Sequence, residues 1–274
     1  MPSLSRSRAP LAHALPSPPV GCALSSGAHI GFEENDPIAQ PASEMLGWVT
    51  RHVQALGTST SSEQVAGNWM MVEAAPANFK VMVKNLDEQK IHHIKFRAVN
   101  AGVTAAGASS SDGSSDELTF YSISNDVDAV SGEDNRTGKM LDFWVTQIGS
   151  FHREQVTTTL NQRAFNKQGL DIEDYIIETS VPAFTVANLL ENQGIPQQNV
   201  DLLLVDTEGL DCQIIMSLDL HGDEGLRPSL VVFEHSHCKE HHRNSLNHLR
   251  GAGYTTFYDR ENSYAIRKVK CIPH

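Results

Sequence analysis

Two carboxylates directly follow a hydrophobic run in the second half of the sequence. In VDLLLVDTEGLD, residues 200–211, Asp206 and Glu208 come after Leu202, Leu203, Leu204 and Val205. An apolar run without alternation is typical of a strand covered on both faces, and open α/β sheets bind ligands at the carboxyl ends of such strands. A carboxylate placed there can take a proton from an attacking hydroxyl or stabilise positive charge. An Asp before a helix can also be simply an N-cap.

The two acids differ in the role that we expect of each. Neighbouring carboxylates push their pKa values apart, so we expect one of them to titrate near neutrality. We predict that Asp206 is the catalytic base and that Glu208 positions the acceptor. His235 is the alternative base because the unperturbed pKa of histidine lies near physiological pH, although a histidine at a strand end is more often structural.

A glycine-containing loop follows the first predicted strand, at residues 20–26. In SSGAHIGFEENDP, Gly27 and Gly31 would allow the backbone to approach a nucleotide-like ligand, since a side chain would block it. Glu73 ends the second predicted strand, where an acid accepts both hydroxyls of a ribose. The separation from Gly27 to Glu73 is about twice the usual ~20 residues, so Glu73 could instead be a solvated strand-end acid.

Strand-like and helix-like patterns alternate along the chain. The sequence predicts strands at 20–26, 68–73, 93–100, 201–206 and 228–235, helices at 41–56, from Pro76, at 209–220 and at 242–253, and a closing hairpin at 254–268. This order is typical of a doubly wound, mostly parallel α/β sheet with an antiparallel hairpin at its C-terminal edge. A Gly/Ser/Asp-rich stretch after the third strand, 105–117, interrupts the pattern.

The domain organisation follows from this interruption. We interpret residues 105–180 as an insertion or lid that shapes the acceptor site, and we expect the sheet to resume with residues 176–194. Residues 20–274 are expected to form one domain. Residues 1–19 contain Ser and Arg but no acid, which is the composition of an organellar transit peptide or of a disordered tail.

Charge and composition exclude some classes of function. The net charge of −12 without a basic stripe argues against binding to nucleic acid. The longest apolar runs are far shorter than the roughly 20 residues of a membrane span. The four cysteines, Cys22, Cys212, Cys238 and Cys271, are scattered without a CxxC pair. This distribution indicates neither a disulfide framework nor a zinc ribbon, and it favours a reducing, cytoplasmic location.

The motifs together resemble a known family. The stretches GAHIG, VEAAPANFKVMVKNL, QIGSFHRE, DLLLVDTEGLD and RPSLVVFEH occur in the same order as in the FkbM family of S-adenosylmethionine-dependent methyltransferases. The resemblance implies a Rossmann-like class I methyltransferase fold, S-adenosylmethionine as cofactor and a small hydroxylated acceptor. The implied reaction is O-methylation of a sugar or another small metabolite.

The resemblance also implies a role for individual residues. The implied cofactor-binding residues are Gly27, Ala28, Gly31, Glu73, Asn100 and Ala101, with Asp206 and Glu208 facing the transferred methyl. The implied acceptor residues are Ser150, Phe151, Arg153 and Glu234, with His235 ending the same strand as Glu234. Ser25 departs from the family pattern, which usually has an acid two residues before the first loop glycine.

A histidine-rich segment, EHSHCKEHHRNSLNH, leaves a second function open. On a helix, Cys238 with His242, or His237 with His241, would lie at i and i+4 and could share a metal. We favour a solvated helix start and predict no metal site. The alternative function is that of a catalytically degenerate binding or scaffold protein, with a metal held by residues 235–248.

Overall fold

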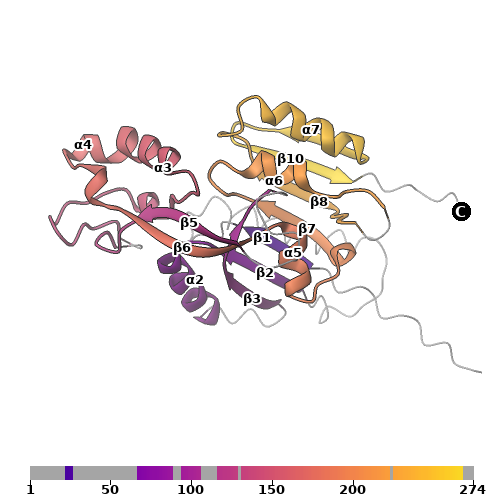
Figure 1. The fold of residues 1–274 in the computed structure, drawn as a ribbon, viewed down its shortest axis with the longest axis horizontal. Helices are drawn as coiled ribbons and strands as arrows, with labels where there is room; N and C mark the ends of the chain where they lie inside the picture. The colour runs from indigo at the N-terminus through magenta and orange to yellow at the C-terminus, as the bar shows by residue number, and fades with distance from the viewer. Residues whose placement is uncertain are drawn as a thin grey trace, which may run out of the picture.

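The fold combines two β-sheets with surrounding helices (Figure 1). The computed structural model describes residues 22–26, 67–88, 94–105, 116–128, 131–222 and 225–267. The predicted α/β class is confirmed. The predicted helix at 41–56, the glycine loop at 27–31 and the tail at 1–19 lie outside the described residues.

The larger sheet has seven strands in the order β3-β2-β1-β7-β8-β10-β9. Their bounds are β1 (Cys22–Ser26), β2 (Gly67–Glu73), β3 (Ile94–Asn100), β7 (Val200–Val205), β8 (Leu230–Glu234), β9 (Tyr254–Tyr258) and β10 (Asn262–Arg267). The neighbours from β3 to β8 pair in parallel. β10 runs antiparallel to β8 and β9, which confirms the predicted closing hairpin.

The apolar run of β7 lies in the main hydrophobic core. Leu203 and Val205 are buried there with Met70 and Val72 of β2 and with Phe233 of β8. The register brings the carboxyl ends of these strands to one edge, because Ser26 of β1 pairs with both Val72 and Val205. The residues that follow β2 and β7 therefore begin close together in space.

Within the described residues, four helices accompany this sheet: α2 (Pro76–Glu88), α5 (Val186–Asn192), α6 (Asp211–Ser217) and α7 (His241–Gly251). A 3₁₀ turn, η4 (Gln197–Asn199), precedes β7. Helix α6 is shorter than the predicted range 209–220, because Glu208 and Gly209 adopt positive φ and delay its start. None of the helices within the described ranges has the length and apolar character needed to cross a bilayer.

The smaller sheet contains β4 (Gly102–Val103), β6 (Ile176–Phe184) and β5 (Asp116–Ile123), in that order. The prediction that the main sheet resumes at residue 176 was therefore wrong. β6 pairs antiparallel with β5 from Asp116↔Ala183 to Ile123↔Ile176. Burial alternates along the second half of β6, which is the pattern of a ribbon with one solvated face and not of a central parallel strand.

The segment between β5 and β6 forms a lobe with its own core. Its elements are η1 (Phe143–Gln147), α3 (Arg153–Leu160), the π-helical η2 (Asn161–Phe165), α4 (Asn166–Gln168) and η3 (Ile172–Asp174). Val145, Val156, Leu160 and Phe165 are fully buried within it. Figure 1 shows α3 and α4 beyond one end of the β5–β6 ribbon, away from α7. The lobe thus has apolar contacts of its own, and the boundaries 105–180 stay a prediction.

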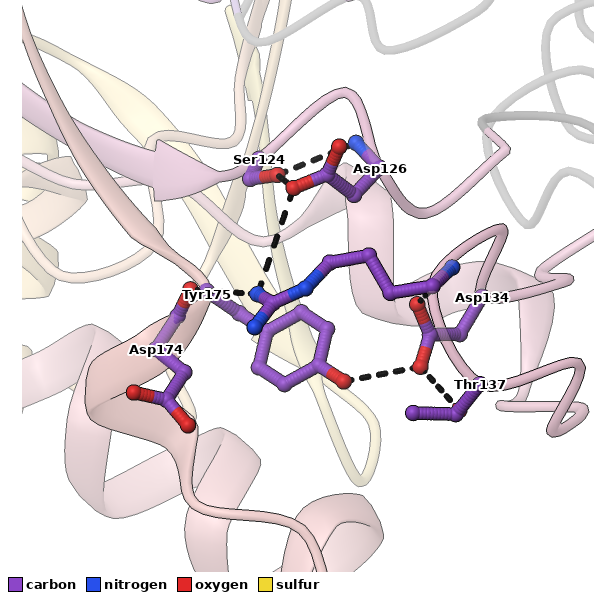
Figure 2. A network of polar contacts seen from close by, with 7 residues as sticks. Ser124, Asp126, Asp134, Thr137, Asp174 and Tyr175 are labelled. Atoms are coloured by element: carbon purple, nitrogen blue, oxygen red, sulfur yellow. Dashed lines mark hydrogen bonds and ion pairs between the residues drawn. The ribbon is translucent and has the colours of Figure 1, made fainter.

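A buried carboxylate organises the polar side of this lobe (Figure 2). Asp134 accepts hydrogen bonds from the hydroxyls of Thr137 and Tyr175, the latter at 2.7 Å, and from the backbone N–H of Arg136 at 3.0 Å. The Arg136 guanidinium lies 4.7 Å from the centre of the Tyr175 ring. Burial opposes ionisation of Asp134, but these hydrogen bonds outweigh it and lower its pKa.

We expect Asp134→Asn to destabilise the protein by about 2 kcal/mol, since the amide leaves a buried donor unsatisfied. Because folding lowers the pKa of Asp134, its ionised carboxylate stabilises the folded protein above pH ~4. This stabilisation is lost as the pH falls through the folded-state pKa. Urea unfolding at pH 7 and at pH 3 measures both effects. Asp142→Asn is the matched control, because Asp142 is exposed and caps no helix through its side chain. Equal effects of the two substitutions at pH 7 would contradict the role of Asp134.

Candidate active site

A pocket lies at the carboxyl edge of the larger sheet, between the ends of β2 and β7 and the lobe. Five residues selected from the sequence line it: Glu73, Ala101, Phe151, Asp206 and Glu208. The other lining residues are Val72, Ala74, Ala75, Gly102, Val103, Phe120, Gln147, Gly149 and Thr207. The pocket encloses about 40 Å³, enough for a small chemical group and too little for a nucleoside.

Glu73, the last residue of β2, lines this pocket. Its Oε1 accepts the backbone N–H of Ala75 at 2.7 Å, and the residue is 4% exposed. Asn100 does not line the pocket, but its side-chain amide donates to the carbonyls of Glu73 at 2.7 Å and of Ala74 at 3.2 Å. The backbone N–H of Ala101 also donates to the Glu73 carbonyl. Asn100 therefore positions the backbone that carries Glu73.

Two glycines allow an aromatic wall on the other side of the pocket. The rings of Phe120 and Phe151 meet edge to face with centroids 5.2 Å apart. A Cβ at Gly102 would lie 2.1 Å from the Phe151 ring, and one at Gly149 would lie 2.5 Å from the Phe120 ring. Because neither position has room for a side chain, both glycines are required by this packing. Sequence reasoning selected Phe151 as a site residue but missed Phe120, Gly102 and Gly149.

The turn after β7 is held by a buried acid. The carboxylate of Asp211 accepts the backbone N–H groups of Thr207 at 3.0 Å and Gly209 at 3.1 Å. Burial raises the pKa of Asp211 to about 8, and the nearby charges of Asp206 and Glu234 act in the same direction. Sequence reasoning passed over Asp211, although this buried acid lies in the same motif as Asp206 and Glu208. Helix α6 begins after Leu210 without a side-chain cap, so Asp206 is not an N-cap.

Glu208 sits in the left-handed region, with φ at 51°, followed by Gly209 at 122°. A non-glycine residue in this conformation is uncommon, and such positions cluster at functional sites. Ser150 from the lobe donates its hydroxyl proton to the Glu208 carbonyl at 3.3 Å. Ser150 is buried and fixes the backbone of the turn, and it does not line the pocket.

A histidine from the loop after β8 reaches the Glu208 side chain. Nε2 of His237 lies 3.5 Å from a Glu208 carboxylate oxygen, and Nδ1 of His237 lies 2.7 Å from the side-chain amide of Gln155 on α3. Glu234 at the end of β8 offers a carboxylate oxygen within 4.8 Å of the ligand atoms of both Glu208 and His237. The sequence had pointed to His237, but with His241 as its partner.

The comparisons with known proteins agree with this architecture. The family model for the methyltransferase FkbM domain matches residues 27–256. The chain belongs to the FkbM methyltransferase family. No curated protein and no solved structure matched the chain. The resemblance stated from the sequence is thus confirmed, and so is the assignment to the methyltransferases.

Some residues assigned through the FkbM resemblance lie outside the pocket, and three others fall outside the described residues. Arg153 forms an exposed ion pair with Glu173 within the lobe and does not line the pocket. The backbone of Ser25 lies in β1, whereas Gly27, Ala28 and Gly31 fall outside the described residues. The structure therefore leaves the consequence of Ser25 for donor binding as a prediction.

His235 does not line the pocket of this FkbM-family chain. Its ring stacks on that of His242 with centroids 4.1 Å apart, and its Nδ1 lies 3.1 Å from the Ser263 hydroxyl. Burial lowers the pKa of both His235 and His242, which favours neutral rings. The pair links β8 to α7 and β10, a structural position that sequence reasoning had named as the more frequent one.

The scattered spacing of the cysteines gave no indication of a disulfide, and on this point the sequence interpretation was wrong. Cys212 of α6 and Cys238 form a disulfide with their Cα atoms 5.7 Å apart. The spacing of 26 residues gave no signal, because only the fold brings α6 beside the loop that follows β8. Because of the disulfide and the late start of α7 at His241, the two pairs considered as alternatives, Cys238 with His242 and His237 with His241, do not lie on one helix.

Removing this disulfide should cost about 3 kcal/mol, because the cross-link closes a loop of moderate length in the unfolded chain. Urea unfolding of Cys212→Ala/Cys238→Ala against the oxidised wild type measures the difference. Cys271→Ala is the control, since it removes a cysteine outside the described residues. An unchanged unfolding midpoint in the double variant would contradict the prediction.

Proposed function

We propose that this protein transfers the methyl group of S-adenosylmethionine to a hydroxyl of a sugar or another small metabolite. The observation that carries the proposal is the meeting of Glu73 and Asp206, from the ends of β2 and β7, in one pocket. The first suits the ribose of a nucleoside, and the second suits an attacking hydroxyl. Membership of a methyltransferase family supports the reaction class.

The chemistry of the pocket suits a cationic donor. S-adenosylmethionine supplies a sulfonium whose methyl group is open to in-line displacement. Glu73, Asp206 and Glu208 contribute carboxylates to the pocket wall, and carboxylates favour positive charge in a site that partly excludes water. The Glu73 carboxylate is already oriented by the N–H of Ala75, which reduces the entropy lost when it accepts ribose hydroxyls. The pocket would form the reacting end of a larger donor site.

Asp206 would hold the acceptor hydroxyl and take its proton as the new bond to carbon forms. An alcohol is a poor nucleophile until it is deprotonated, so a base within hydrogen-bond reach accelerates the displacement. The aromatic wall of Phe120 and Phe151 would exclude water, which could otherwise compete as the acceptor. Glu208 would fix the orientation of the acceptor from the adjacent turn.

The test is transfer of tritiated methyl from S-adenosylmethionine to a panel of sugars and small hydroxylated compounds. We expect label in at least one acceptor as a methyl ether that is stable to mild base. Label released as methanol by mild base would reveal a carboxylate acceptor and contradict O-methylation of a hydroxyl. Labelling of amines alone would contradict it equally.

A further inference from the structure

We propose that Glu208, Glu234 and His237 bind one divalent transition-metal ion beside the pocket. Their potential ligand atoms, one from each side chain, all lie within 4.8 Å of one another. Two carboxylates and one imidazole are donors that Mn²⁺, Fe²⁺ and Zn²⁺ accept, and three protein ligands leave coordination positions open. The sequence had instead suggested pairs within the histidine-rich segment, and those pairs do not form.

The three ligands come from rigid and separate parts of the fold. Glu234 ends β8, which pairs in parallel with β7, and Glu208 lies in the turn that follows β7. His237 directly precedes Cys238, whose disulfide to Cys212 ties the loop to α6. A metal site needs ligands that are held in place before the ion arrives, and the covalent tie provides this for His237.

Gln155 can orient the imidazole for coordination. Its amide nitrogen, Nε2, lies 2.7 Å from Nδ1 of His237. Oxygen and nitrogen of an amide exchange places by a half-turn, so Gln155 can also accept a proton carried on Nδ1. The lone pair then lies on Nε2, the atom that faces Glu208. A ligating histidine usually makes such a bond with its second nitrogen.

Electrostatics also favour a cation at this place. Glu208 and Glu234 bring two carboxylates to the cluster, and Asp206 lines the pocket together with Glu208. Like charges gathered in a partly buried site repel one another, and a divalent ion would offset that repulsion. The alternative is that no metal binds and that Glu208 forms an ion pair with a protonated His237, whose Nε2 lies 3.5 Å from a Glu208 carboxylate oxygen.

The ion would have a catalytic use that rests on the proposed function. Glu208 is one of the three proposed metal ligands, and it also lines the pocket proposed for methyl transfer. An acceptor oxygen in an open coordination position would have a lowered pKa and would lose its proton more easily to Asp206. Acceptors with two neighbouring oxygens, such as a vicinal diol or a 2-hydroxy acid, would fit two open positions.

The test is titration of Mn²⁺ into the chelator-treated full-length protein, followed by calorimetry and by electron paramagnetic resonance. We expect one saturable site per chain in the wild type. Glu234→Gln and His237→Ala should each weaken Mn²⁺ binding by about 100-fold, and Gln155→Leu by about 10-fold. His241→Ala is the matched control, since it removes a histidine four residues away that is outside the cluster, and it should bind Mn²⁺ as the wild type does.

Two results would overturn the proposal: no saturable Mn²⁺ or Zn²⁺ site in the wild type, or an equal loss in His241→Ala and His237→Ala. The absence of a saturable site would mean that Glu208 and His237 form only an ion pair. Folding of each variant is checked by thermal unfolding. Binding of S-adenosylhomocysteine is measured separately in Glu234→Gln, so a failed donor site and a failed metal site give different results.

Discussion

Replacing Asp206 with Asn is expected to lower kcat for methyl transfer by about 1000-fold, within the usual range for removing a general base. Binding of the product S-adenosylhomocysteine should change by less than about threefold, because the substituted group acts on the acceptor proton. Asn keeps the volume of the side chain in the pocket but cannot accept a proton. Single-turnover transfer of labelled methyl and calorimetry measure the two quantities.

Asp201→Asn is the matched control for Asp206. Asp201 lies on the same strand β7, near its amino end, and is exposed. We expect Asp201→Asn to retain wild-type kcat. Unchanged turnover in Asp206→Asn, or an equal loss in both variants, would remove Asp206 from the proposed mechanism.

Replacing Glu73 with Ala should weaken binding of S-adenosylhomocysteine by about 1000-fold, or about 4 kcal/mol. The proposed contact consists of two hydrogen bonds from ribose hydroxyls to a buried carboxylate, each of which contributes about 1.5–3 kcal/mol. Glu73→Gln should give an intermediate loss, because the amide retains one acceptor oxygen.

The stability of the Glu73 variants must be followed as well, since the carboxylate also accepts the N–H of Ala75. Glu117→Ala is a suitable control: Glu117 lies in β5 and contacts Ser180 in the smaller sheet, away from the pocket. Donor binding by Glu73→Ala at wild-type affinity, in a folded protein, would rule out the ribose contact.

Local patterns predicted the parts of the fold that depend on neighbours in sequence. The unbroken apolar run of β7 identified that strand, the short segments that became β9 and β10 were expected as a closing hairpin, and Pro76 marked the start of α2. The sequence identified β6 as an extended segment but assigned it to the wrong sheet. Strand partners depend on contacts between residues far apart along the chain.

The candidate site was predicted where it follows strand ends and missed where it depends on tertiary contacts. Glu73 ends β2 and Asp206 directly follows β7, and both strands pair in parallel with β1, so their sequence position predicted their place in the pocket. Gly102 and Gly149 are required only because two phenylalanine rings pack against them. The contact of His237 with Glu208 and the disulfide of Cys212 with Cys238 join segments that no local spacing relates.

The most direct test of the central claim is calorimetric titration of the purified protein with S-adenosylhomocysteine, before and after chelation. We predict saturable micromolar binding, one molecule per chain, that survives chelation, because the proposed contact of Glu73 with the ribose requires no metal. Absence of binding under both conditions would contradict a donor site in this protein, and with it the proposed methyl transfer.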